Sequence, residues 1–190
     1  MQIYRWPEMP TLPSVGSPVL LRVPVPAARP EARREVRAVL RAVLANWSGV
    51  TVDQIQLVES GRGPVWLQQN DSANVDISLS YGAGEAWIGL VRGGRIGVDM
   101  MRVEPFAEAP DVARNYLGPI AAAEIEKAPD PACAFAAAWT KHEARLKCAK
   151  RDLREWSGEE TTVGGIMELA GEDWVGVVAV TGLCGAWRKI

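Results

Sequence analysis

Two acidic residues and one lysine stand in sequence contexts that could support chemistry. Asp99 lies inside a predicted strand, residues 95–101 (RIGVDMM), on the same face as Gly97 and Met101. Glu143 and Lys147 are four residues apart in residues 135–147 (FAAAWTKHEARLK), so they share one row of a predicted helix. A hard cation such as Mg²⁺ binds one or two carboxylates and completes its shell with water and phosphate oxygens. The pattern therefore allows Asp99 and Glu143 to hold Mg²⁺ together.

Simpler interpretations fit the same residues. Glu143 and Lys147 could form an ordinary ion pair on a solvated helix face. Asp99 could be a buried acid capped by backbone donors, or it could meet solvent at a strand end. Gly97 has no side chain, so a bulky ligand could approach the backbone beside Asp99. Residue types and spacing alone leave these alternatives open.

The sequence predicts two long helices, one of which carries Glu143 and Lys147. Asp130 is a good N-cap and Pro131 suits a first turn, which predicts that the helix bearing Glu143 begins there. Phe135, Trp139 and Leu146 would lie on or near one of its faces. A second helix of about sixteen residues would begin at Pro30 and stop at Asn46 and Gly49. Its buried stripe would comprise Val36, Val39, Leu40, Val43 and Leu44, with Arg33, Arg37 and Arg41 on the opposite face.

Strand patterns occur before and after the helix that begins at Pro30. Residues 19–25 read as an edge strand with Pro24 near its end. Residues 75–80 alternate, with Val75, Ile77 and Leu79 on one face and Ser78 and Ser80 on the other. Residues 86–91 and 95–100 flank Gly93-Gly94, which predicts a hairpin. Further expectations are a turn at residues 61–64, helices over residues 105–128 broken near Gly118-Pro119, and a strand at residues 174–180 paired with residues 186–190.

The element order predicts an α+β protein made of two intimately packed subdomains, residues 1–98 and 99–190. The 190 residues carry a formal net charge of -2, so no global basic field favours nucleic acid. The longest apolar run is too short to span a bilayer. The three cysteines lack paired spacing, which indicates neither a disulfide framework nor a zinc site. These features predict a cytoplasmic protein that binds no membrane.

Gly97-Val98-Asp99, followed about forty residues later by residues 139–147 (WTKHEARLK), looks like the paired signature of the 4'-phosphopantetheinyl transferases. Residues 75–82 (VDISLSYG) lie where that family carries a strand ending in Ser-His-Ser. Residues 61–64 (GRGP) lie where it carries a Gly-Lys-Pro turn. The resemblance covers residues 31–180. The chain length resembles the larger, surfactin-type branch, whose members are two-fold pseudo-symmetric monomers that bind coenzyme A in a cleft between their halves.

This resemblance implies transfer of the 4'-phosphopantetheine arm of coenzyme A to a serine of an acyl or peptidyl carrier protein, with release of adenosine 3',5'-bisphosphate. Asp99 and Glu143 would hold Mg²⁺. Glu143 would also help to deprotonate the serine, and Lys147 would meet a phosphate oxygen. The residues expected at coenzyme A are Arg37, Arg62, Ser78, His142 and Lys147, with Arg37 and Arg62 near the 3'-phosphate.

The sequence also departs from the family pattern. Met101 replaces a second acid, and a thioether is a poor ligand for a hard cation. Leu79 replaces the histidine of Ser-His-Ser, His142 replaces a lysine, and an extra glycine shifts Arg62. These departures motivate the alternative of a catalytically degenerate relative that binds a carrier protein or an acyl-coenzyme A without transfer.

Overall fold

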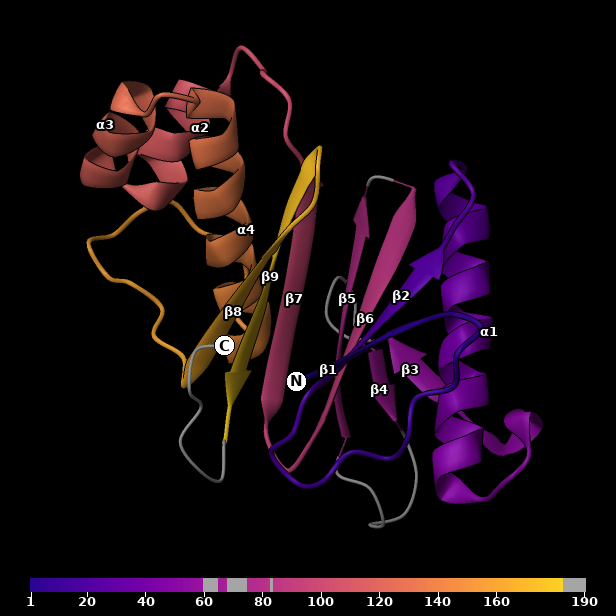
Figure 1. Cartoon of the computed structure of the whole chain (residues 1–190). Helices are drawn as coiled ribbons and strands as arrows, with labels where there is room; N and C mark the ends of the chain where they lie inside the picture. The colour runs from indigo at the N-terminus through magenta and orange to yellow at the C-terminus, as the bar shows by residue number, and fades with distance from the viewer. Residues whose placement is uncertain (60–64, 68–74, 83, 183–190) are drawn as a thin grey trace.

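Two β-sheets pack face to face, and one long helix covers the outer surface of each (Figure 1). The computed structural model describes residues 1–59, 65–67, 75–82 and 84–182. The fold is α+β, as the sequence predicts. From one side to the other, the layers are α1, the first sheet, the second sheet and α4.

The first sheet contains four strands. In the order of their pairing they are β1 (Gln2–Arg5), β2 (Val19–Pro24), β6 (Glu85–Arg92) and β5 (Val75–Gly82). β1 runs parallel to β2, and the other neighbours are antiparallel. β2 is therefore an inner strand, which corrects the prediction of an edge strand. The seven prolines of residues 1–30 exclude a helix there. They do not indicate that residues 2–5 pair with the outer edge of β2.

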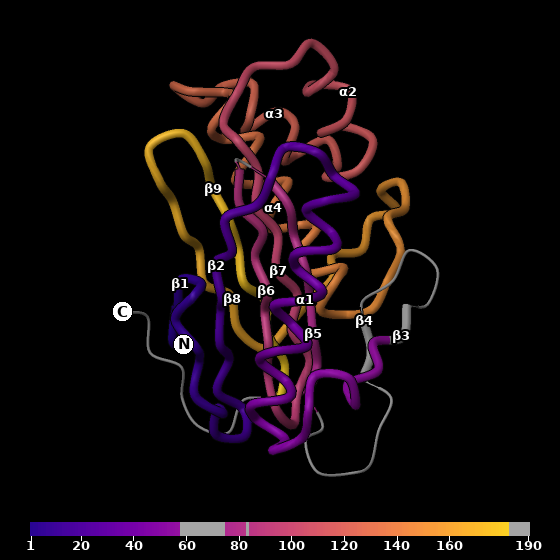
Figure 2. Tube along the Cα trace, turned by 90° about the vertical axis from the view of Figure 1, so that its right-hand side faces the viewer, coloured from indigo at the N-terminus to yellow at the C-terminus, as the bar shows by residue number. Residues whose placement is uncertain are grey.

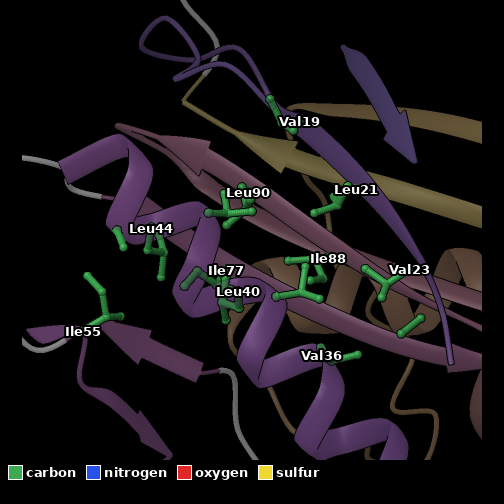
Figure 3. Packing of buried hydrophobic residues seen from close by; sticks show 14 residues of the cluster. Val19, Leu21, Val23, Val36, Leu40, Leu44, Ile55, Ile77, Ile88 and Leu90 are labelled. Carbon is green, nitrogen blue, oxygen red and sulfur yellow. The ribbon is translucent and has the colours of Figure 1, made fainter. Parts of the chain in front are cut away.

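Helix α1 (Arg29–Ser48) follows the predicted stripe but is longer than expected, with 20 residues. Pro30 lies in its first turn, and Asn46 stays within it. Gly49 ends the helix in the left-handed conformation (φ 67°), and its N–H bonds back to the carbonyl of Ala45. Figure 3 shows Val36, Leu40 and Leu44 reaching the strands of the first sheet. Burying each such side chain contributes about 1.5–3 kcal/mol.

The second sheet contains β7 (Arg95–Arg102), β9 (Trp174–Thr181) and β8 (Gly165–Ala170), in that order and antiparallel throughout. Helix α4 (Pro131–Ala149) packs on its outer face through Ala144 and Cys148. Towards the first sheet, β7 presents Ile96, Val98 and Met100, all buried. The side chain of Val98 occupies the space beside Gly89 on β6, where a Cβ would collide with it. This fit fixes β7 against the first sheet.

The predicted hairpin at Gly93-Gly94 is wrong. β6 pairs with β2 and β5, whereas β7 pairs with β9, so the two glycines lead the chain from one sheet into the other. Gly93 adopts a left-handed φ of 69°, which glycine tolerates at little cost. The physical reason is burial, because every interior residue of β6 is covered and the sheets must stack.

Smaller elements complete the chain. They are a 3₁₀ turn (Val52–Gln54), the hairpin of β3 (Leu57–Glu59) and β4 (Val65–Leu67), α2 (Ala109–Val112), a π-helical turn (Ala113–Leu117) and α3 (Pro119–Lys127). The break at Gly118 matches the prediction. Figure 2 shows α2 and α3 together at one end of the molecule. The predicted turn at residues 61–64 and strand at residues 186–190 lie outside the described residues.

Candidate functional site

The site lies where α4 crosses β7, and local sequence signals position the helix. Asp130 is its N-cap, and the carboxylate accepts a hydrogen bond from the N–H of Cys133 at 3.0 Å, as predicted. Gly97 lets the helix approach, because a Cβ at that position would collide with the backbone of α4 at Ala144 and Cys148. The suggestion that a bulky ligand could approach the backbone beside Gly97 is therefore wrong, because the backbone of α4 occupies that space.

β7 has one edge that pairs with β9 and one edge that faces β5 without a backbone ladder. Side chains of β5 satisfy the amides of this second edge, at three alternate positions. Asp76 accepts from Ile96 N–H at 2.7 Å, Ser78 from Val98 N–H at 3.0 Å, and Ser80 from Met100 N–H at 3.1 Å. We call these three contacts the seam. They pair edge donors that would otherwise be buried without a partner.

Asp99 sits at one end of the seam and is 8% exposed. Its Oδ1 accepts two hydrogen bonds, from the hydroxyl of Ser80 at 2.9 Å and from the ammonium of Lys147 at 2.7 Å. No described residue donates a hydrogen bond to Oδ2. The carboxylate is thus held firmly by one oxygen while the other has no donor in the described chain.

Lys147 uses all three protons of its ammonium within the protein. Besides Asp99, it donates to the carbonyls of Val98 at 3.1 Å and Leu79 at 3.4 Å. It therefore ties β5, β7 and α4 together. Its partner is Asp99, so the alternative of a surface ion pair with Glu143 is not what the described residues form.

Glu143 lies one helical turn before Lys147 and is half-buried. Burial raises the pKa of its carboxyl; Lys147 opposes this shift and the neighbouring charge of Asp99 adds to it. Within the described chain, no side chain or amide pairs with Glu143. When Glu143 is ionised, the two carboxylates and the ammonium of Lys147 carry a net charge of one negative unit, which favours a cation at the site.

The side chains of Asp99 and Glu143 are of the chemical type that a magnesium ion binds. Asp99 and Glu143 offer hard carboxylate oxygens, and each has an oxygen without a described donor. Among the described residues, no three histidine, cysteine or acidic side chains gather at one point. The ion would therefore depend on water and substrate oxygens for the rest of its shell, which Mg²⁺ accepts readily.

The structure distributes the other predicted site residues differently. Ser78 is 3% exposed, and its hydroxyl accepts the amide of Val98 within the seam. Arg37 lies near Tyr81 on the α1 side of β5, whereas Ser80, the preceding residue, faces Asp99 on the other side. The structure therefore does not bring Arg37 to the two carboxylates. Arg62 lies outside the described residues.

His142 is next to Glu143 on α4. Its Nε2 is buried and has no hydrogen-bond partner in the described part of the chain. Its ring lies 6.1 Å from that of Trp139. Burial, together with the nearby charge of Arg145, lowers the pKa of the imidazole. The neutral form is therefore favoured.

Sequence reasoning missed one contributor to the site, Ser80, which orients Asp99. It also missed the ion pair of Asp76 with Lys150 at 2.8 Å, which lies at the other end of the seam from Asp99. One signal could have revealed them: polar residues at positions 76, 78 and 80 form an unbroken row on one face of a strand whose other face is apolar. Such a row in an enclosed strand indicates a polar partner.

A hollow of about 590 Å³ lies beside the C-terminal end of α4, lined by Arg95, Cys148, Arg151 and neighbouring residues. None of the predicted site residues lines it.

No helix in the described ranges is long and apolar enough to cross a membrane. The chain matches no known protein-family profile. A search of curated proteins also finds no match.

Proposed function

We propose that this protein transfers the 4'-phosphopantetheine arm of coenzyme A to a serine of an acyl or peptidyl carrier protein, with Mg²⁺ as cofactor. The observation that carries the proposal is the convergence of Asp99, Glu143 and Lys147. They come from a strand and a distant helix, in the order and spacing of the family signature. We further propose that it works as a cytoplasmic monomer.

The arrangement of strands supports the same conclusion. In the first half, β2, α1, β5 and β6 occur in this order, with β3 and β4 inserted before β5, and β6 lies between β2 and β5 in the sheet. From β7 onward, β7, α4, β8 and β9 occur in the same order, with α2 and α3 inserted before α4, and β9 lies between β7 and β8. A repeat of this kind is what a two-fold pseudo-symmetric fold would have. Coenzyme A would bind between the halves, taken as residues 1–98 and 99–190.

The proposed reaction forms a bond between the serine oxygen and the phosphorus that carries the pantetheine arm. It breaks the bond between that phosphorus and the bridging oxygen of the diphosphate, so the leaving group is adenosine 3',5'-bisphosphate, whose 5'-phosphate is the other phosphate of the link. Bound Mg²⁺ would neutralise charge on the diphosphate. Glu143 would accept the serine proton, directly or through water. Its raised pKa suits this role, because a more basic carboxylate is a better proton acceptor near neutral pH.

Lys147 would keep Asp99 in place and add positive charge beside the phosphates. Because its three protons already have acceptors, a direct bond to a phosphate oxygen would replace an existing one. The long contact to Leu79 at 3.4 Å is the weakest of the three. Ser78, His142, Arg37 and Arg62 stay proposed contacts of coenzyme A.

Mass spectrometry tests the proposal. The purified protein is incubated with coenzyme A, Mg²⁺ and a panel of apo carrier proteins. We expect one carrier to gain the mass of a phosphopantetheine arm, and chelation of Mg²⁺ should stop the reaction. Glu143→Gln should abolish transfer, whereas Glu126→Gln on the exposed surface of α3 should not. If no carrier is modified, or if Glu143→Gln is fully active, the proposal fails.

One observation favours a second candidate. Met101 stands where the family has another acid, and the described residues hold no third metal-binding side chain near Asp99 and Glu143. The protein could thus bind coenzyme A or a carrier protein without transfer. Calorimetry separates the two functions: coenzyme A binding that is unchanged by Mg²⁺ supports the binding protein, and metal-dependent binding supports the enzyme.

A further inference from the structure

We propose that Ser80 is a positioning residue for Asp99, and that it confines cation binding to a single oxygen, Oδ2. The inference rests on the proposed metal site, but it concerns a residue to which neither the family resemblance nor the comparisons give a role. Ser80 is 4% exposed and lies on β5, at the end of the seam.

The hydrogen bonds of Ser80 leave its hydroxyl one orientation. The N–H of Met100 donates to Oγ at 3.1 Å, which occupies the acceptor side of the hydroxyl. The single hydroxyl proton then points to Asp99 Oδ1 at 2.9 Å. Ser80 therefore fixes the orientation of the Asp99 carboxylate relative to the β7 backbone. Residues just outside a metal site orient the metal ligands of other proteins in the same way.

Lys147 completes the arrangement. Its ammonium donates to the same oxygen. Oδ1 therefore accepts two hydrogen bonds, one from Ser80 on β5 and one from Lys147 on α4. A cation approaching Oδ1 would have to displace a buried hydroxyl or an ammonium ion. Oδ2 has no described donor, so Asp99 is built to bind through one oxygen.

Binding through one oxygen has a consequence for the choice of ion. Mg²⁺ needs few protein ligands and an octahedral shell, whereas Ca²⁺ takes six to eight oxygens and favours carboxylates that supply both. Two carboxylates, one of which is restricted to a single oxygen, make a poor calcium site. The contact from Ser80 therefore contributes to selectivity for Mg²⁺ over Ca²⁺.

The test uses the whole protein and the two metal ions alone. Backbone amide NMR signals of wild type, Ser80→Ala and Ser80→Cys are followed through titrations with Mg²⁺ and Ca²⁺. Cysteine keeps most of the side-chain volume but is a weak donor. Both variants should bind Mg²⁺ about tenfold more weakly than wild type. Ca²⁺ binding should weaken less, so the ratio of the two Kd values should shift towards Ca²⁺.

Asp76→Ala is the matched control. It removes a seam contact to Ile96 and the ion pair with Lys150, but it leaves both donors of Asp99 Oδ1 in place. It should lower Tm and keep the Mg²⁺ affinity of wild type. The inference is overturned if the Ser80 variants bind Mg²⁺ as tightly as wild type, or if Asp76→Ala weakens binding equally.

Two failures remain distinguishable. Wild-type protein whose signals near Asp99 do not respond to Mg²⁺ refutes the metal site and this inference together. Wild-type protein that binds Mg²⁺ through Asp99, with weaker binding in the Ser80 variants, but modifies no carrier supports this inference and refutes only the proposed transfer.

Discussion

Replacing Gly97 with alanine tests how tightly the site depends on the contact between β7 and α4. The added Cβ would overlap the carbonyl oxygen of Ala144 and the amide nitrogen of Cys148, both backbone atoms of α4 that cannot rotate away. The helix as a whole must shift, by about 1 Å, to restore a van der Waals contact. Overpacking of this kind costs about 1–3 kcal/mol in the free energy of unfolding.

The same shift would carry Glu143 and Lys147 away from Asp99, because all three depend on the spacing between helix and strand. A displacement of about 1 Å can reduce catalytic activity about 100-fold. Urea unfolding measures the stability change, and carrier-protein modification or Mg²⁺ binding measures the effect on the site. At this chain length, each 1 kcal/mol lowers Tm by about 2–4 °C.

Gly82→Ala is a suitable control. A Cβ there would lie 3.5 Å from the carbonyl oxygen of Met100 and 3.7 Å from its Cγ, which are ordinary contacts. We expect this variant to behave like wild type. If Gly97→Ala is as stable as wild type and binds Mg²⁺ equally well, α4 does not pack on β7 as described, and the geometry of the site is wrong.

Three further predictions concern ionisable groups. Burial raises the pKa of Glu143 above its usual 4.5, so the stabilising contribution of this side chain is present below pH 4.5 and is lost as the pH rises. Glu143→Gln should therefore raise Tm above that of wild type at pH 7 but not at pH 4. Equal Tm values of the variant and wild type at pH 7 would contradict this. The pKa of His142 is lowered from 6.5, so its contribution is present above that pH and is lost as pH falls. His142→Gln should consequently lose less stability than wild type between pH 7 and pH 5 in thermal melts, and an identical loss would refute the assignment. Burial raises the pKa of the Cys148 thiol to about 11, so iodoacetamide at pH 8 should label it only after unfolding, as mapped by mass spectrometry; rapid labelling of the folded protein would contradict its burial.

The helices could be predicted because their signals are local. Asp130, Pro131 and the spacing of Phe135 fix the start and face of α4 within a few residues of chain. The positive φ of Gly49 ends α1 in the same way. Capping and periodicity depend on neighbours in sequence, so a single sequence contains them.

Strand partners could not be predicted with the same success. Gly93-Gly94 between two apolar strands is typical of a hairpin, but β6 and β7 belong to different sheets. The deciding factor is tertiary, because Val98 and Ile96 pack into the space beside Gly89 on the facing sheet. No local pattern encodes that complementarity.

The candidate site shows the same division. Residue type and spacing singled out Asp99, Glu143 and Lys147, but they did not predict the ion pair between Lys147 and Asp99. Ser80 was seen only as the polar face of a strand. The contact of Ser80 with Asp99 depends on how β5 lies against β7. These two strands belong to different sheets, so no strand-pairing pattern predicts the contact.

The most direct test of the central claim is the location of a bound metal ion. Crystals grown or soaked with Mn²⁺, which replaces Mg²⁺ and scatters anomalously, would show the ion as a peak in an anomalous difference map. We predict one peak about 2.0–2.3 Å from Oδ2 of Asp99 and from a carboxylate oxygen of Glu143, a distance typical of such ions. A map without this peak, or with an ion bound by only one of the two carboxylates, would contradict the account.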